Sequence, residues 1–190
     1  MSGSSTVAAE PRTLTVSYHT AETLPSFEPL LLNLYAEIYA AEAATDPFFS
    51  VERFTDRLRR HAAASRWGCV LGEVDGALIG YAYGFARTAD YGWAGLVSTV
   101  SDVDLEEHDT RTFALCEVMV RQDFRGTGTA RTLHEELLSH RIEERSNLLV
   151  DEGHPKVLAL YERWGYSTMG IMQPYPDSPR YVSMLRPIRL

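Results

Sequence analysis

The sequence predicts a mixed α/β fold, in which a central, mostly antiparallel sheet is flanked by helices. Strand-like and helical patterns alternate along most of the chain. Two apolar runs joined through Asp75-Gly76 predict an antiparallel hairpin. Further along, a strand, a helix and a second strand predict a βαβ crossover, which requires one parallel pair within the sheet.

Composition indicates a single domain. The chain has 190 residues, of which 45% are hydrophobic, and no apolar run reaches the length of a membrane span. Residues 1–11 are small and polar, so we expect a flexible tail followed by one domain over residues 12–190. A net charge of −8 argues against a nucleic acid or an anionic membrane as partner. Cys69 and Cys116 lie in apolar segments and are expected to be reduced thiols of a cytoplasmic protein.

The front half of the chain predicts two strands and two helices before the second arm of the hairpin. A first strand is expected at Thr13–His19, and a helix at Ser26–Ala44 with a proline in its first turn. Ser50 is suited to cap a second helix. In the hairpin, Cys69–Ala86, one face of the second arm carries only glycine and alanine, so a helix or ligand could approach that face closely.

The back half begins with a long, irregular and acidic segment, Arg87–Arg111. Connections of that length inside a compact domain are usually functional or disordered. The elements expected after it are a buried strand at Phe113–Val120, a helix from about Gly128 to Glu143, a strand at 146–153, a helix at 154–165, and strands at 166–172 and 180–188.

Glycines mark the junction where the buried strand gives way to the next helix. Gly126 and Gly128 leave bare backbone at a helix N-terminus, where free N–H groups and the helix dipole suit a phosphate or pyrophosphate. A capped turn without a ligand is the alternative. A Walker A loop is excluded, because the only lysine is Lys156. A dinucleotide fingerprint is excluded because it needs three spaced glycines, whereas Gly126 and Gly128 give one Gly-x-Gly followed by Ala130.

The run VRQDFRGTGTARTLHEELL resembles the acyl-CoA-binding motif of the GNAT superfamily, the Gcn5-related N-acetyltransferases. A second segment, NLLVDEGHPKVLALYERWGY, resembles the family's following strand and helix. The residues in register with the two motifs are Arg125, Gly128, Ala130, Tyr161, Gly165 and Tyr166. The order of elements matches over nearly the whole chain. The resemblance implies a GNAT fold of about seven strands and four helices, and an N-acetyltransferase that uses acetyl-CoA.

The resemblance also implies which residues hold the coenzyme. Backbone N–H groups of the central strand would hold the pantetheine arm and polarise the acyl carbonyl, at Val118, Met119 and Val120. The diphosphate would lie on the amides of the junction, which are those of Arg125, Gly126, Thr127, Gly128, Thr129 and Ala130. His154 stands where many members of the family have an asparagine. Its imidazole could hydrogen-bond the pantetheine arm. If the resemblance is set aside, the position of His154 favours a cap of the following helix.

Two residues are candidates for catalysis. Tyr161 corresponds to the tyrosine that donates a proton to the departing sulfur in the family, whereas its spacing alone favours a core tyrosine. Glu117, on the central strand beside the expected acyl group, is the best candidate for the base that removes a proton from the acceptor. A structural ion pair and an edge-exposed side chain are the alternatives for Glu117.

The acceptor site is suggested by aromatic and acidic residues. Tyr91 and Trp93 lie in the acidic segment Asp90–Asp109, which would favour a cationic amine, although charge runs are usually solvated surface. Phe48 and Phe49 in the turn DPFFS either form an apolar wall of the site or fill the core.

The predicted function is therefore acetyl transfer from acetyl-CoA to a primary amine of a small cationic molecule of the aminosugar, aminoglycoside or polyamine type. The alternatives are a protein N-terminal or lysine acetyltransferase and a non-catalytic acyl-CoA-binding domain. No metal is expected, because the six histidines lack paired-ligand spacing. No Gly-x-Ser-x-Gly elbow of a serine hydrolase occurs. A homodimer is left open.

Overall fold

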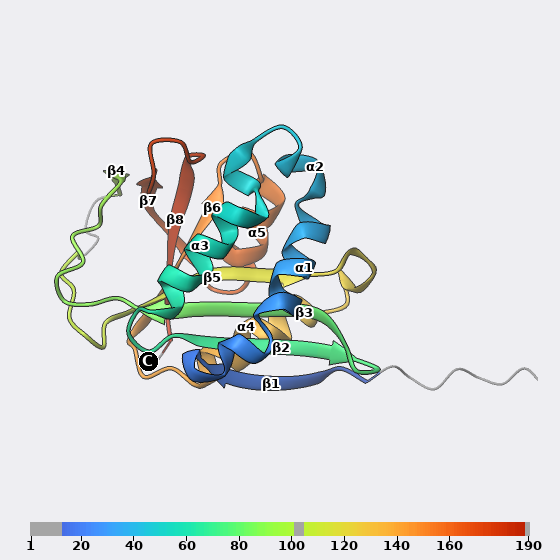
Figure 1. The fold of residues 1–190 in the computed structure, drawn as a ribbon. Helices are drawn as coiled ribbons and strands as arrows, with labels where there is room; N and C mark the ends of the chain where they lie inside the picture. The colour runs from blue at the N-terminus through green and yellow to red at the C-terminus, as the bar shows by residue number, and fades with distance from the viewer. Residues whose placement is uncertain (1–12, 101–104, 189–190) are drawn as a thin grey trace, which may run out of the picture.

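The computed structural model describes residues 13–100 and 105–188, so the predicted tail 1–11 lies outside the described residues. One eight-stranded sheet has the order β1-β2-β3-β5-β6-β8-β7-β4 (Figure 1). Its strands are β1 Thr15–Thr20, β2 Gly68–Val74, β3 Ala77–Ala86, β4 Leu96–Thr99, β5 Thr112–Val120, β6 Arg145–Asp151, β7 Ser167–Met172 and β8 Tyr181–Pro187. Only β5 and β6 pair in parallel among these strands, which confirms the mixed, mostly antiparallel sheet.

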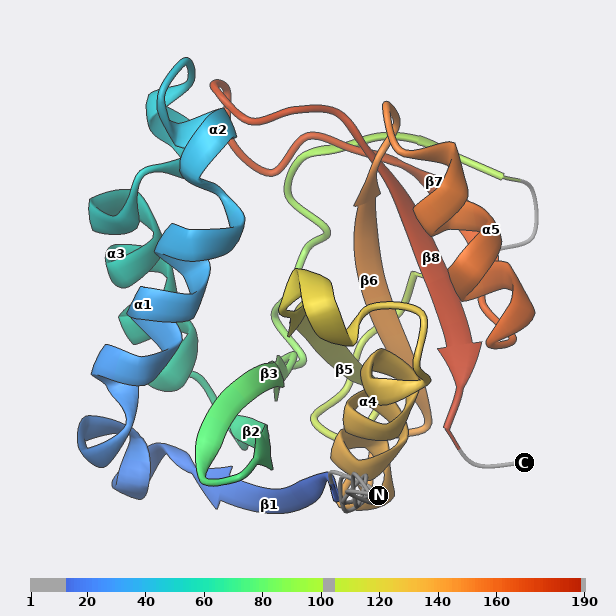
Figure 2. The ribbon, with the colours of Figure 1, turned by 90° about the vertical axis from the view of Figure 1, so that its right-hand side faces the viewer.

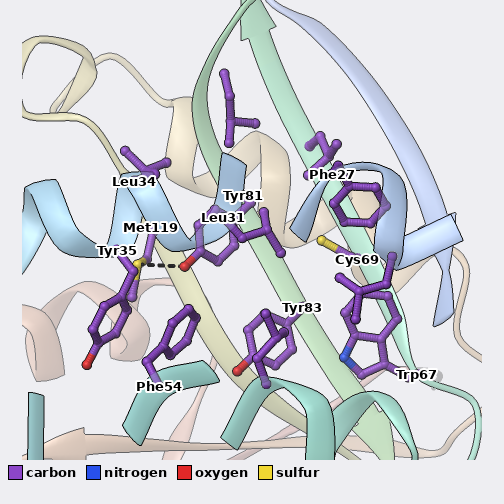
Figure 3. Packing of buried hydrophobic residues seen from close by; sticks show 14 residues of the cluster. Phe27, Leu31, Leu34, Tyr35, Phe54, Trp67, Cys69, Tyr81, Tyr83 and Met119 are labelled. Atoms are coloured by element: carbon purple, nitrogen blue, oxygen red, sulfur yellow. Dashed lines mark hydrogen bonds between the residues drawn. The ribbon is translucent and has the colours of Figure 1, made fainter. Parts of the chain in front are cut away.

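Helices cover both faces of the sheet (Figure 2). The α-helices are α1 Glu28–Ile38, α2 Ala40–Ala43, α3 Val51–Ala62, α4 Thr129–Ser139 and α5 Pro155–Arg163, with 3-10 turns at Ala21–Ser26, Pro47–Phe49 and Gln122–Phe124. Helices α1 and α3 pack on β2 and β3 around Leu31, Phe54 and Tyr81, none of which is exposed (Figure 3). Helices α4 and α5 cover the opposite face through a second cluster that includes Leu133 and Trp164.

The expected helix Ser26–Ala44 is wrong in its extent. The chain leaves helical geometry at Tyr39, whose φ and ψ are −102° and 18°, and α2 continues for a single turn. The Tyr39 ring packs between those of Tyr35 (4.7 Å) and Phe49 (5.3 Å), so side-chain packing accompanies the break. Ser50 does cap α3, because its hydroxyl accepts the N–H of Arg53.

Two further elements differ from expectation: the end of helix α4 and an additional edge strand. Helix α4 ends at Ser139 rather than Glu143, because the chain turns to bury the ion pair of Arg141 and Glu143, 3.0 Å apart. The segment Arg87–Arg111 is not wholly irregular. Its residues Leu96–Thr99 form β4 at the edge of the sheet, which raises the strand number to eight. This strand is short and largely exposed, so it lacks the apolar alternation that identifies a strand.

The glycine face of β3 allows close packing, as predicted. A Cβ added at Gly80 would lie 3.0 Å from the side chain of Leu133 in α4. At Gly84 an added Cβ would lie 2.2 Å from the carbonyl oxygen of Ala114. Because this second neighbour is backbone of the adjacent strand, it cannot move aside without disturbing the ladder.

We therefore expect Gly84→Ala to lower the free energy of unfolding by about 2–3 kcal/mol, from overpacking at the β3–β5 ladder. Denaturant unfolding measures this directly. Gly92→Ala is the control, because a Cβ there meets no atom within 4 Å. Equal stability of the two variants would contradict the close approach of β3 and β5 at Gly84.

Candidate active site

Strands β5 and β6 form a ladder only at their beginnings. Thr112, Phe113 and Ala114 pair with Arg145, Ser146 and Asn147. Beyond Ala114, β5 remains paired with β3 as far as Val120, while β6 remains paired with β8 as far as Asp151 (Figure 2). The second half of β5 therefore has an unpaired edge on the side of β6, and we call the space along this edge the β5–β6 split.

The hydrogen-bond pattern of β5 decides which amides face the split. The N–H of Arg121 donates to the carbonyl of Ile79 on β3 (2.8 Å), so alternate residues before Arg121 also face β3. Met119, paired with Tyr81, belongs to that set. Val118 and Val120 instead direct their N–H and C=O groups towards the split. Consistently, the Val120 carbonyl accepts the Nε–H of Arg125 (3.0 Å).

The junction between β5 and α4 leaves a run of free amides. The first backbone hydrogen bond of α4 runs from Thr132 N–H to the Gly128 carbonyl. Preceding amides from Gly126 onward make no backbone hydrogen bond within the described residues. Gly126 and Gly128 have φ of 77° and 89°, and a Cβ at either would meet no atom within 4 Å. Open space above free N–H groups at a helix N-terminus fits a phosphate or pyrophosphate.

The neighbours of these glycines order the junction. The Thr127 hydroxyl donates to the Phe124 carbonyl (2.7 Å) and lies 2.8 Å from the hydroxyl of Thr129. Arg125 is exposed, and its Nε is bound to Val120 as described above. Ala130, half-buried in the first turn of α4, packs on the second core cluster, which includes Leu133 and Trp164. The strand end and the junction are thus tied together by one arginine side chain.

Tyr161 lies on α5 and is half-buried. Its ring packs edge-on against Trp164 (5.2 Å) and Tyr166 (5.6 Å), so the core contacts expected from its spacing are present. Burial, then the neighbouring Tyr166, then the charge of Glu117 raise the pKa of the Tyr161 hydroxyl well above its usual range. The hydroxyl therefore stays protonated at neutral pH and can act as a proton donor.

His154 is the N-cap residue of α5, but its side chain makes no capping hydrogen bond. The side chain is 64% exposed, and its Nδ1 lies 3.8 Å from Asp151 Oδ2. The interpretation of this imidazole as a helix cap is therefore wrong, and the ring remains available to a ligand.

Glu117 lies at a β-bulge in β5. Tyr83 pairs with Glu117 and Gly84 with Leu115, which leaves Cys116 as the extra residue. Glu117 is half-buried and shares the side of Met119, which faces α1 and α3. Neither alternative for Glu117 is met, since the side chain is neither exposed nor in an ion pair within the described ranges.

Tyrosines surround this carboxyl. Burial first, and the charge of Glu117 second, raise the pKa values of Tyr39, Tyr81, Tyr83 and Tyr181. Burial also raises the pKa of Glu117 to about 7, against the opposing effect of Arg57. A carboxyl that titrates near neutrality can accept a proton from an ammonium group at physiological pH.

Phe48 and Phe49 both lie beside these tyrosines, which together with Tyr35 we call the tyrosine cluster. Phe48 is buried, with the guanidinium of Arg57 stacked 4.7 Å from its ring centre. Phe49 is half-buried against Tyr39. Phe48 thus fills the core, whereas Phe49 extends the aromatic surface near Glu117.

Tyr91 and Trp93 are placed differently from the expectation that they receive a cationic substrate. The guanidinium carbon of Arg87 lies 3.7 Å from the Tyr91 ring centre and 4.4 Å from that of Trp93. Trp93 is only 4% exposed, and its indole N–H donates to the Leu105 carbonyl. Because the chain's own arginine occupies the faces of both rings, we interpret the pair as structural.

The acidic segment around these rings is also partly committed to the fold. Glu107 is buried and pairs with Arg145 (2.9 Å), and Asp109 accepts the N–H of Ala89. Asp102 and Asp104 lie outside the described residues. The described part of the segment is thus not a purely solvated surface, because Glu107 and Asp109 tie it to the rest of the fold.

Four residues of the site were not predicted from the sequence: Tyr35, Tyr39, Arg57 and Tyr181. Their spacing within the predicted helices and strand resembles ordinary core positions, and only the tertiary structure brings them to Glu117.

Across residues 13–100 and 105–188, no group of three or more His, Cys, Asp or Glu side chains is arranged to hold a metal. Across the same ranges, no helix has the length and apolar character needed to cross a membrane.

Strand splitting beside a helix N-terminus with free amides is a geometry suited to a long, phosphorylated ligand. The model of the Acetyltransferase (GNAT) family matches residues 29–166, and the chain belongs to this family of acyl-CoA-dependent N-acyltransferases. Members of the family use acetyl-CoA and act on amines. No curated protein matches the sequence.

Solved structures show the same fold at low identity. Escherichia coli ElaA is 16% identical with a TM-score of 0.60, and the match covers 92% of this chain and 99% of that one. A spermidine N-acetyltransferase SpeG chimera from Vibrio cholerae and hSSAT is 18% identical with a TM-score of 0.57, covering 92% and 95%. The aminoglycoside N-acetyltransferase AAC(6')-Iy, in complex with CoA, is 13% identical with a TM-score of 0.59, covering 89% and 97%.

Burial of Glu117 has a measurable effect on stability. Its folded pKa of about 7 exceeds the ordinary value of 4.5, so the carboxyl is held protonated below pH 7 and its ionisation destabilises the fold as pH rises through 7. We expect Glu117→Gln to stabilise the protein at pH 8 by up to about 3 kcal/mol more than at pH 4.5. Denaturant unfolding at both pH values tests this. Glu162→Gln, at an exposed position, should show no such difference.

Proposed function

We propose that this acetyltransferase transfers an acetyl group to a primary amine of a small cationic molecule, of the aminosugar, aminoglycoside or polyamine type. The observation that carries the proposal is the half-buried carboxyl of Glu117 among tyrosines at the β5 bulge. A carboxylate attracts an ammonium group, and tyrosine rings favour cations through their π faces. The fold shared with a spermidine and an aminoglycoside N-acetyltransferase supports this choice.

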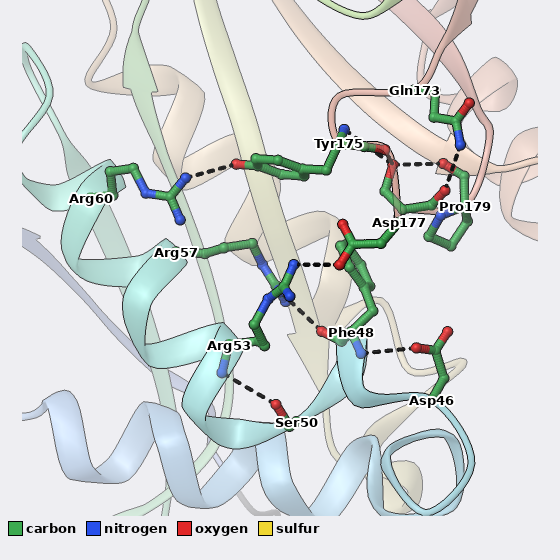
Figure 4. Close-up of polar contacts among 11 residues, drawn as sticks. Asp46, Phe48, Ser50, Arg53, Arg57, Arg60, Gln173, Tyr175, Asp177 and Pro179 are labelled. Atoms are coloured by element: carbon green, nitrogen blue, oxygen red, sulfur yellow. Dashed lines mark hydrogen bonds and ion pairs between the residues drawn. The ribbon is translucent and has the colours of Figure 1, made fainter.

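A second feature favours a small acceptor. Residues 173–180, which we call the β7–β8 loop, reach across to α3 (Figure 4), one of the helices that cover the face of the sheet shared by Glu117 and Met119. Arg53 pairs with Asp177 (2.8 Å), and Arg60 donates to the Tyr175 hydroxyl (3.3 Å). A chain tied across this side suits a slender amine better than a protein segment.

Acetyl-CoA supplies the acyl group as a thioester. We place its diphosphate on the amides from Gly126 to Ala130, with Arg125 adding positive charge. The N–H groups of Val118 and Val120 face the split and would hold the arm and polarise the carbonyl, whereas Met119 is engaged with β3. His154, exposed at the start of α5, could bond the same arm.

The proton movements follow from two side chains. The Glu117 carboxylate accepts a proton from the acceptor ammonium and leaves a neutral, nucleophilic amine. The Tyr161 hydroxyl, which burial keeps protonated, donates its proton to the departing sulfur.

A cytoplasmic location and a homodimer remain predictions.

The acceptor class is tested with a panel of amines and a thiol reagent that reports CoA release. Spermidine, glucosamine and an aminoglycoside are compared with a peptide N-terminus and a peptide lysine. We expect the highest kcat/KM with a small cationic amine, and an acid limb near pH 7 from Glu117. A clear preference for a peptide would favour the protein N-terminal or lysine acetyltransferase instead.

Removal of the Tyr161 hydroxyl separates chemistry from binding. Tyr161→Phe should lower kcat by about 100-fold or more, while CoA affinity measured by calorimetry changes little. Tyr166→Phe is the matched control, because its hydroxyl bonds His134 (2.9 Å) and Ser146 (3.0 Å) inside the core. Unchanged turnover in Tyr161→Phe would remove its catalytic role.

A further inference from the structure

Three arginines line one side of α3 at helical spacing, and only one of them faces inward. Arg53 and Arg60 are exposed and reach the β7–β8 loop (Figure 4). Arg57, between them, is half-buried, and its guanidinium reaches the Tyr35 hydroxyl. Arg57 thus differs from its two neighbours in exposure.

Several contacts fix the guanidinium of Arg57. Its Nη1 donates to the Phe48 carbonyl (3.1 Å), and its Nη2 donates to the Tyr35 hydroxyl (3.2 Å). The Phe48 ring stacks against it at 4.7 Å, and Tyr35 is itself stacked on Phe54 at 3.8 Å. These partners are neutral, so the full positive charge of Arg57 remains uncompensated by them.

Glu117 lies on the same side of the sheet as this guanidinium. Its ladder partner Tyr83 is 3.3 Å from His61, one helical turn beyond Arg57 on α3. Burial disfavours the ionised carboxyl, and the charge of Arg57 is the named opposing effect. Burial is the larger effect, so the pKa of the carboxyl lies at about 7, above its ordinary value.

The other groups that face Glu117 are neutral at that pH. They are Tyr35 from α1, Tyr39 between α1 and α2, Tyr81 and Tyr83 from β3, Tyr161 from α5 and Tyr181 from β8, whose pKa values are all raised. Burial also raises the pKa of Cys116 and lowers that of His61 to about 4, so both are uncharged. Within the described ranges, Arg57 is therefore the one cation that acts on Glu117.

We propose that Arg57 is a positioning residue for the catalytic base: held by Phe48 and Tyr35 on the side of the sheet that Glu117 shares, its guanidinium supplies the positive charge that favours the carboxylate form in which Glu117 accepts the proton of the acceptor ammonium. This inference rests on the proposed function, in which Glu117 takes that proton. Arg57 itself does not exchange a proton with the substrate. Its role is to set the pH above which the base is ready.

The test follows the titration of Glu117 by carboxyl ¹³C NMR, with Glu117→Gln used to assign its signal. In Arg57→Gln we expect the midpoint to rise by about one pH unit, because burial then acts unopposed. Arg57→Lys retains the charge and should keep the midpoint near that of the native protein. Arg59→Gln is the control on the same helix, because Arg59 pairs with Glu28 (2.8 Å) and is 63% exposed.

The pH profile of kcat/KM is measured in parallel, and its acid limb should move with the NMR midpoint. An unchanged Glu117 midpoint in folded Arg57→Gln overturns the inference. If that variant does not fold, Tyr35→Phe, which removes one hydrogen bond to Arg57, should raise the midpoint in the same direction, and no change there also overturns it. A midpoint that moves while the rate profile stays fixed supports the effect of Arg57 but removes Glu117 as the base.

Discussion

The short ladder between β5 and β6 is the constraint on which the site depends. Because only Thr112–Ala114 pair with β6, the rest of β5 keeps one edge paired with β3 and one edge open. The rigid edge fixes where Val118 and Val120 point, and the open edge leaves their N–H groups available. A full ladder would satisfy these amides within the sheet, and the free amides at the start of α4 would then stand alone.

Two opposing effects set the pKa of the Glu117 carboxyl at about 7. Burial alone would keep the carboxyl protonated, and full exposure would give it an ordinary, low pKa. The bulge at Cys116 places it on the side of α1 and α3, where burial and the charge of Arg57 oppose each other. Tyrosines suit this environment because they pack as aromatic residues and remain neutral.

Much of the fold could be predicted from local patterns. The Asp75-Gly76 hairpin, the strand at 113–120 and the glycines before α4 all carry signals that act over a few residues. The edge strand β4 depends on its distant partner β7, and the early end of α4 accompanies burial of Arg141 and Glu143, of which Glu143 also pairs with Arg66. The break at Tyr39 accompanies the packing of its ring with those of Tyr35 and Phe49, so residue patterns alone indicated none of the three. The same limit applies to the site: Tyr91 and Trp93 were expected to receive a cationic substrate, but Arg87, four and six residues before them, lies on both rings, and the residue pattern of an irregular segment does not specify how it folds.

The order of strands also bears on synthesis of the protein. Strand β8 lies between β6 and β7, although it is the last strand in the chain. Until residues 181–187 have left the ribosome, β6 and β7 have no common partner and their edges stay open to other chains. A nascent chain stalled before β8 would therefore be prone to aggregate, and chaperones would have most to protect in this interval.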